Sequence, residues 1–199
     1  MTEPSAGWDP AYQDTPPPWD IGRPQPAFAR LAGAGLLSGR VLDAGCGTGE
    51  HVLLAAAHGA AAMGVDVSGL AIAKARAKAA ERGLTARFEV GDVLHLERLG
   101  ETFDTVTDSG VFHVFDDADR ARYVTSLAAV LEPGGSYYMM CFSDRQPGVW
   151  GPRRVRRDEI EQAFSDGWEI ASITPDEFSV NRIEGTTSVH AWLAVVHRR

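Results

Sequence analysis

One ten-residue run, VLDAGCGTGE at residues 41–50, constrains the fold of this chain more than any other feature. It is typical of a short buried strand that ends in an acid, followed by three alternating glycines and the start of a helix. Glycine has no Cβ, so at Gly45, Gly47 and Gly49 the backbone can turn tightly and a ligand can lie against it. The first N–H groups of the helix favour anionic or acceptor groups on that ligand. The acid, Asp43, suits a cationic amino group.

The spacing of these glycines separates the loop from a better-known fingerprint. A dinucleotide-binding loop has the pattern Gly-x-Gly-x-x-Gly, and Glu50 stands where its third glycine would be. The observed pattern, Asp-x-Gly-x-Gly-x-Gly, therefore disfavours a nicotinamide-dependent oxidoreductase, which is kept as a less favoured alternative.

Length and charge limit the class of protein. A chain of 199 residues suits one domain with a sizeable core. The net charge of −8 argues against nucleic acid as the substrate, because phosphate binding needs clustered Lys and Arg. Two cysteines, Cys46 and Cys141, make neither a disulfide framework nor a metal site. With no signal peptide and no transmembrane segment expected, we predict a cytoplasmic protein that binds neither metal nor membrane.

Residues 1–26 form an arm that differs from the remainder, the expected catalytic domain of residues 27–199. The arm contains seven prolines, which prevent regular helix, and three large aromatics, Trp8, Tyr12 and Trp19. A disordered tail would be poor in aromatics, so we expect the arm to order by docking as a lid.

From Phe28 onward, strand and helix signals alternate, which predicts an α/β fold with a mostly parallel sheet and helices on both faces. The last two strands, 168–180 and 187–196, are expected to form an antiparallel hairpin that completes seven strands. The other expected strands are 40–43, 62–66, 86–90, 102–108 and 136–142, and the expected helices are 49–58, 69–82, 117–131 and 157–165.

Four acids, Asp43, Asp66, Asp92 and Asp108, end or follow the first four expected strands. Ligands of open α/β sheets bind beyond the carboxyl ends of the strands. Asp66 is placed to accept both ribose hydroxyls of an adenosine, the alternative being a helix-entry cap. Asp92 suits the adenine amino group, with Val93 packing on the ring, the alternative being a local turn.

The segment after the fourth acid, DSGVFHVF at residues 108–115, should flank the reacting group. Phe112 is expected in the core or in the pocket wall. His113 has two interpretations: a structural histidine bonded under the loop, or a general base or substrate-orienting group. The other five histidines have no ligand spacing and are not expected to act. They are His51, His58, His95, His190 and His197.

With these residues in view, the chain resembles the class I S-adenosylmethionine-dependent methyltransferases, whose fold is Rossmann-like. Within that class it resembles the small-molecule branch that contains thiopurine methyltransferase-like, tellurite-resistance-type and halide or thiol methyltransferases. The narrower resemblance depends on residues 17–26 (PPWDIGRPQP), on Asp108-Ser109-Gly110 with Phe112 and His113, and on residues 158–168.

The resemblance implies S-adenosylmethionine as cofactor and methyl transfer to O, N or S of a heterocyclic, phenolic, quinol or thiol small molecule, as in detoxification. A noncatalytic S-adenosylmethionine-binding protein is the other alternative, and a monomer or homodimer is expected. The implied acceptor-site residues are Trp19, Phe112, His113 and Trp150, with His113 as the catalytic candidate. The implied cofactor-binding residues are Trp19, Arg23, Asp43, Ala44, Gly45, Cys46, Gly47, Gly49, Asp66, Val67, Asp92, Val93, Asp108 and Ser109.

Overall fold

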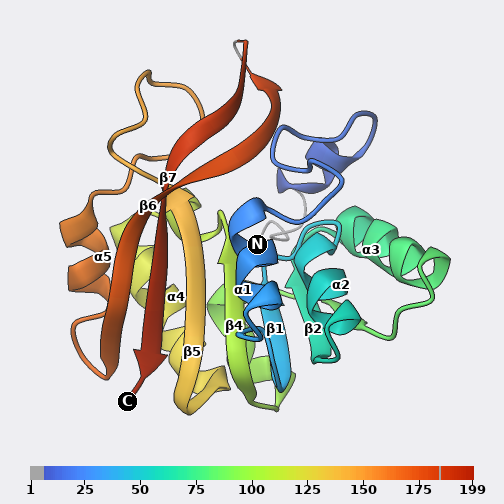
Figure 1. The fold of residues 1–199 in the computed structure, drawn as a ribbon, viewed down its shortest axis with the longest axis horizontal. Helices are drawn as coiled ribbons and strands as arrows, with labels where there is room; N and C mark the ends of the chain where they lie inside the picture. The colour runs from blue at the N-terminus through green and yellow to red at the C-terminus, as the bar shows by residue number, and fades with distance from the viewer. Residues whose placement is uncertain (1–6, 184) are drawn as a thin grey trace.

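Seven strands form one mixed sheet in the order β3-β2-β1-β4-β5-β7-β6 in the computed structural model, which describes residues 7–183 and 185–199 (Figure 1). The first five strands are parallel, and β7 runs antiparallel to both β5 and β6. The predicted α/β fold with its terminal hairpin is confirmed. The strands are β1 (Arg40–Ala44), β2 (Ala61–Asp66), β3 (Arg87–Val90), β4 (Phe103–Ser109), β5 (Leu131–Phe142), β6 (Trp168–Ile183) and β7 (Thr186–Arg198).

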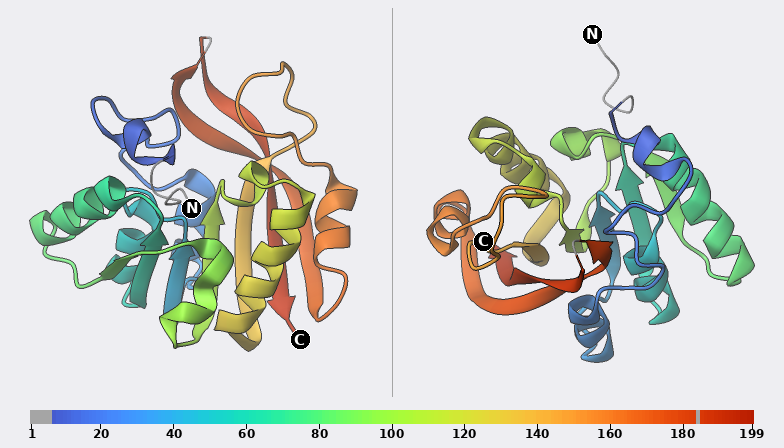
Figure 2. Two further views of the ribbon diagram at one scale, coloured as in Figure 1. Left: turned by 180° about the vertical axis from the view of Figure 1, so that it is seen from behind. Right: turned by 90° about the horizontal axis from the view of Figure 1, so that it is seen from above.

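Helices cover both faces of the sheet (Figure 2). One face packs against the apolar sides of α1 (Pro26–Gly33), α2 (Glu50–Ala57) and α3 (Gly69–Glu81). The other packs against the 3-10 segment η3 (Val93–Leu99) and against α4 (Asp117–Val130) and α5 (Arg157–Ala163). Because both faces of the sheet are covered, the middle strands β1 and β4 are almost wholly buried.

The helix starts follow their side-chain signals. Ser68 Oγ accepts the N–H of Ala71 at 3.1 Å and begins α3, and Asp116 does the same for α4 through Asp119. One strand differs from its prediction. β5 begins at Leu131 rather than at residue 136, because Leu131 pairs with Phe103 before an irregularity, after which regular pairing resumes at Ser136.

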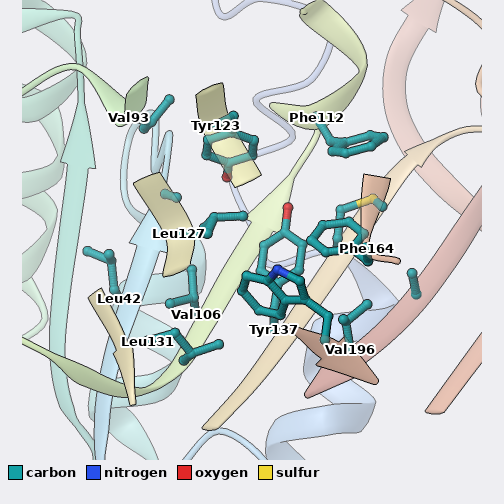
Figure 3. Close-up of a cluster of buried hydrophobic side chains, with 14 of the residues drawn as sticks. Leu42, Val93, Val106, Phe112, Tyr123, Leu127, Leu131, Tyr137, Phe164 and Val196 are labelled. Carbon is teal, nitrogen blue, oxygen red and sulfur yellow. The ribbon is translucent and has the colours of Figure 1, made fainter. Parts of the chain in front are cut away.

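The core between the sheet and α4 buries two tyrosines, Tyr123 and Tyr137, among aliphatic side chains such as Leu42, Val106 and Leu127 (Figure 3). A hydroxyl buried without a partner is costly, so both tyrosines need acceptors inside this core. Asp108, near the end of β4, supplies the acceptor for both hydroxyls.

The arm lies across the end of the sheet where the parallel strands finish, beside the upper half of the β6–β7 hairpin (Figures 1 and 2). Asp9, in the 3-10 turn η2 (Asp9–Tyr12), accepts a hydrogen bond from Ser68 Oγ at 2.6 Å. At the other end of the arm, the N–H of Asn181 donates to Pro18 O at 2.7 Å. The arm thus bridges α3 and β6, although residues 1–6 lie outside the described part. No helix in that part is long and apolar enough to cross a membrane.

Candidate functional site

The glycine-rich loop, residues 45–49, turns directly from β1 into α2. The N–H groups of Gly45 and Cys46 both donate to Val65 O, at 2.8 and 2.9 Å, which fixes the loop beside the end of β2. Gly45 has a φ of 70°, and a Cβ there would lie 2.2 Å from Val111 Cγ2, so only glycine fits. The missing side chain therefore lets Val111 pack directly against the loop.

Asp43 ends β1 with a buried carboxylate that is half satisfied. Its Oδ1 accepts the hydroxyl of Thr107 at 2.7 Å, while its Oδ2 has no hydrogen-bond partner among the described residues. Nδ1 of His51 lies 3.8 Å from that oxygen, too far for a direct bond. Burial, together with the nearby Asp108 and Asp66 carboxylates, raises the pKa of Asp43 to about 7, and the hydrogen bond from Thr107 opposes that rise. An unpartnered buried oxygen of this kind fits a cationic ligand group.

Asp66 ends β2 directly beneath the loop. One carboxylate oxygen accepts the N–H of Gly47 and the other the N–H of Ser68, each at 2.8 Å. Burial raises the pKa of this carboxyl, and the two backbone N–H groups oppose that rise. Each oxygen keeps a second lone pair, so the group can still accept from ligand hydroxyls. The helix-cap alternative is met by Ser68 itself.

The residues expected around an adenine ring lie next along this edge. Asp92 is half-buried, and its Oδ1 accepts the N–H of Leu94, as in the turn alternative, at 2.9 Å. Val93 is buried and Val67 half-buried. Ala44 and Cys46 are buried, so they offer a ligand mainly their backbone.

Asp108 differs from the expectation of a cofactor contact. Its fully buried carboxylate accepts the hydroxyls of Tyr123 and Tyr137 at 3.0 and 2.7 Å and the N–H groups of Val111 and Phe112 at 2.7 and 3.1 Å. Figure 3 shows both tyrosines within the buried cluster that also contains Phe112. Four bonds occupy the acceptor capacity of a carboxylate. These contacts support a structural role, in which Asp108 anchors the turn that carries the histidine.

The ring of Phe112 lies in the core and not in a pocket wall. Its ring is fully buried, stacks on Phe164 with centroids 5.9 Å apart, and carries the guanidinium of Arg120 at 4.4 Å. Of the two alternatives for Phe112, the structure supports the core.

His113, in the 3-10 turn η4 (Phe112–Val114), is buried at the end of β4. Its Nδ1 accepts the backbone N–H of Phe142 at 2.9 Å, so in the neutral ring the proton is on Nε2. Nε2 lies beside Gly110, 3.2 Å from where a Cβ would be. Burial, aided by the charges of Arg154 and Arg120, lowers the pKa of His113 to about 3. The neutral ring is therefore a hydrogen-bond donor at Nε2.

Aromatic rings surround His113 on the side away from the loop. Phe142 meets it edge-on at 5.0 Å, and Phe178 of β6 lies 6.1 Å away. Trp150 packs on Phe142, and the guanidinium of Arg154 lies over both rings at 5.4 and 5.3 Å. We call His113, Phe142, Phe178 and Trp150 the aromatic wall.

A single arginine organises the loop that carries Trp150. Arg154 donates to the carbonyl oxygens of Trp150 and Pro152 at 2.9 and 2.7 Å and to that of Gln146 at 3.2 Å. These bonds wind the segment between β5 and α5 around one guanidinium, so the position of Trp150 depends on Arg154.

The arm residues expected at the site are only partly there. Trp19 is 46% exposed, and its Nε1–H donates to the hydroxyl of Tyr12 at 3.1 Å. Arg23 is exposed and makes no hydrogen bond or ion pair with the described residues. Neither side chain lies against the glycine loop in this conformation.

Two residues missed in the sequence do lie against the site. The buried hydroxyl of Tyr12 is 3.1 Å from where a Cβ of Gly47 would be, and burial and the nearby Asp66 raise its pKa. His51 faces Asp43 from the first turn of α2. A histidine directly after a glycine loop is a signal that could have been used, since that turn must pack beside the strand end.

These features fit the ligand that the resemblance implies. The unpartnered Oδ2 of Asp43 suits an ammonium, and the remaining lone pairs of Asp66 suit ribose hydroxyls. Among residues 7–183 and 185–199, no group of three or more His, Cys, Asp or Glu side chains is arranged to hold a metal ion.

The chain is similar to known methyltransferases. Residues 41–135 match the family model of the methyltransferase domain. The chain is 33% identical to 2-heptyl-1-hydroxyquinolin-4(1H)-one methyltransferase of Mycobacteroides abscessus, over 92% of this chain and 89% of that protein. It is 28% identical to a probable thiol methyltransferase 2 of Arabidopsis thaliana, over 94% and 84%.

A solved structure from work on the conversion of a disulfide bond into a thioacetal group during echinomycin biosynthesis is also similar. It superposes with a TM-score of 0.87 at 39% identity, covering 98% of this chain and 92% of that one. Both kinds of similarity extend over nearly the whole chain, arm and hairpin included. The chain therefore belongs to the class I S-adenosylmethionine-dependent methyltransferases.

Proposed function

We propose that this methyltransferase acts on a small molecule with a heterocyclic, phenolic, quinol or thiol group, at O, N or S. The aromatic wall beside Gly110, with the Nε2–H of His113 as a polar donor, carries this proposal. Rings of this kind pack well against a flat apolar acceptor, and one donor can orient a single polar atom. A hydroxyquinolinone and a thiol are named for two of the relatives, which supports the same classes.

S-adenosylmethionine would supply an electrophilic methyl group bonded to a sulfonium sulfur. An acceptor lone pair attacks the methyl carbon in line with the C–S bond, which breaks as the thioether leaves. We propose that Oδ2 of Asp43 holds the ammonium of the cofactor, that Asp66 accepts its ribose hydroxyls, and that Asp92 accepts from its adenine amino group. The loop backbone at Gly45, Gly47 and Gly49, with Val67, Val93 and Ser109, would complete the cofactor site. Positioning and exclusion of water then account for most of the acceleration.

His113 acts in this proposal as a donor rather than as a base. Its Nδ1 lone pair is engaged by the N–H of Phe142, and its Nε2 already carries a proton. A donated hydrogen bond stabilises the ionised form of an acceptor O–H or S–H and so lowers the pKa of that group, whose proton leaves to solvent.

A methyl-transfer assay with labelled cofactor tests the proposal directly, with thiols, phenols, hydroxyquinolines and quinols as separate panels. We expect turnover of at least one acceptor that combines a flat ring or soft sulfur with an ionisable proton. Tight cofactor binding with no turnover in any panel would instead favour the noncatalytic alternative.

Binding of the cofactor should release protons from Asp43. Its pKa of about 7 means that the free protein carries this proton below pH 7, and an ammonium placed on Oδ2 lowers the pKa and expels it. We expect affinity to be about tenfold weaker at pH 6 than at pH 7.5, with close to one proton released at pH 6. Calorimetry in two buffers with different ionisation enthalpies measures both quantities. An Asp43→Asn variant with the same pH dependence would assign the effect to another carboxyl group at the site, such as Asp66, whose pKa is also raised by burial.

The arm, we propose, is a lid over the cofactor. Its Tyr12 hydroxyl faces the loop, and its Asp20 Oδ2 accepts the hydroxyl of Thr48 at 2.9 Å. Removing residues 1–22 should leave a folded domain, because Gln25 and α1 keep their contacts with β6 and α2. We expect cofactor affinity to fall about tenfold, as for one lost hydrogen bond to a partly charged site. Calorimetry and amide exchange of residues 7–22 measure this, and exchange that ignores both ligands would contradict the lid.

We also propose that the small molecule is the main partner and that the protein works in the cytoplasm as a monomer or homodimer, in a detoxifying reaction. The net charge of −8 disfavours nucleic acid, and both cysteines are free and buried, as suits a reducing compartment. Sedimentation at assay concentrations distinguishes the two oligomeric states.

A further inference from the structure

His51 lies in the first turn of α2, with 11% of its side chain exposed and its ring against Phe28, centroids 4.5 Å apart. Burial lowers the pKa of His51 to about 4, although the neighbouring Glu50 opposes that shift. The ring is therefore neutral at physiological pH, and one of its two nitrogens carries the proton.

The arm decides which nitrogen that is. The backbone N–H of Gln25, at the junction of arm and α1, donates to Nε2 of His51 at 3.1 Å. Nε2 must then be the acceptor, which leaves the proton on Nδ1. Nδ1 faces Oδ2 of Asp43 at 3.8 Å, and that oxygen is the one without a partner.

We propose that His51 is a positioning residue for Asp43. Its Nδ1–H presents a fixed donor dipole to the carboxylate, which favours the ionised form that a ligand ammonium requires. This inference rests on the proposed assignment of Asp43 to the cofactor ammonium.

The charges around Asp43 make such a donor necessary. Asp66 and Asp108 both lie close enough to raise the pKa of Asp43, and among the residues that the structure describes only Thr107 donates to it. The separation of 3.8 Å leaves the gap between Nδ1 and Oδ2 for a third polar group, a bound water or the ligand itself.

The same contacts tie the arm to the far side of the sheet. The side-chain amide of Gln25 donates to Ser179 O and accepts the N–H of Ser179, each at 2.9 Å. Ser179 follows Phe178 of the aromatic wall on β6. The backbone of residue 25, through His51, thus connects the cofactor end of the site with the strand that bounds the acceptor end.

Three variants of His51 test the proposal through the pH dependence of cofactor binding, measured by calorimetry rather than by activity. His51→Phe keeps the ring volume and removes both nitrogens. We expect the midpoint of affinity against pH to rise by about one unit, since the pKa of Asp43 rises by that amount, which weakens binding about threefold at pH 7.5 and about tenfold at pH 6. His51→Asn places an amide N–H near Nδ1 and should restore most of both quantities, whereas His51→Leu should not.

Gln25 supplies a matched pair for the backbone contact. Its φ of −61° and ψ of 141° are compatible with proline, so Gln25→Pro deletes the N–H at little local strain. Gln25→Ala keeps the N–H, and both variants lose the bonds to Ser179. We expect the midpoint of cofactor affinity against pH to rise in Gln25→Pro and to stay unchanged in Gln25→Ala.

Each result decides a separate point. Nitrogen-15 NMR of the histidine rings should show His51 protonated at Nδ1, and a proton on Nε2 would overturn the proposal without any ligand. A midpoint that stays at its original pH in folded His51→Phe, while the melting temperature falls, would also overturn it and leave His51 merely structural. If Asp43→Asn binds cofactor normally at every pH, the assignment of Asp43 fails instead.

Discussion

Replacing Asp66 with alanine is expected to weaken S-adenosylmethionine binding by roughly 10- to 150-fold, which corresponds to about 1.5–3 kcal/mol for a lost charge-assisted hydrogen bond. Asp66 is the one acid at this edge that both fixes the glycine loop, through the N–H of Gly47, and keeps lone pairs for a ligand. Titration calorimetry of the folded variant measures the loss.

Ser68→Ala is the matched control for this experiment. It removes the cap of α3 and the contact with Asp9, yet leaves the Asp66 carboxylate and the bond from Gly47 in place. We expect lower thermal stability and nearly unchanged affinity in the control. Unchanged affinity in a well-folded Asp66→Ala would remove Asp66 from the ribose site.

Replacing His113 with phenylalanine is expected to slow methylation of a phenol of high pKa by about 10- to 100-fold at pH 7. The reason is the lost Nε2–H donor, without which the pKa of the bound phenol rises by about 1–2 units. The alkaline rise of the pH–rate profile should shift by the same amount. An acceptor that is already ionised at pH 7 should be much less affected, because it has no proton left to lose.

His113→Gln, which carries a side-chain N–H of similar reach, serves as the rescue variant and should recover part of the shift. Equal slowing of both acceptor types, with an unshifted profile and a lower melting temperature, would mean that His113 only supports the Phe142 backbone. A general base predicts a pH–rate profile that loses its dependence on a group in the enzyme. The occupied Nδ1 and the pKa of about 3 argue against that outcome.

The sequence was sufficient for those parts of the site whose chemistry is local. The loop at residues 45–49 and the acids at the ends of β1 and β2 follow from neighbours in the chain: a strand, a glycine pattern and a helix start. Because parallel strands end at one edge, the location of the site followed as well.

The role of Asp108 depends on residues distant in sequence, and so it could not be read locally. Tyr123 and Tyr137 lie 15 and 29 residues further along the chain, and only the packing of α4 against β5 brings their hydroxyls to the carboxylate. The same holds for Phe112, whose burial depends on Arg120 and Phe164. The sequence predicted that Asp108 lies at a strand end, but it gave no sign that the two tyrosines donate to its carboxylate.

For the arm, the sequence predicted docking but not which side chain faces the loop. Its docking was expected from its aromatics, yet the residue that faces the loop is Tyr12, while Trp19 lies half exposed behind it. Proline-rich segments have no period from which to judge which side chain faces inward. His51 was set aside because it has no metal-ligand spacing, and its backbone partner Gln25 precedes it by 26 residues.

The bonds between Gln25 and Ser179 also set an order of events during synthesis. Residue 25 leaves the ribosome early, whereas its partner on β6 is translated 154 residues later. At about 5–20 residues per second, the arm waits roughly 8–30 s before its anchoring strand exists. Until then the Gln25 side chain lacks its native partner, and nothing on β6 holds the arm at residue 25. The arm can therefore take its final position only when nearly the whole polypeptide has been synthesised.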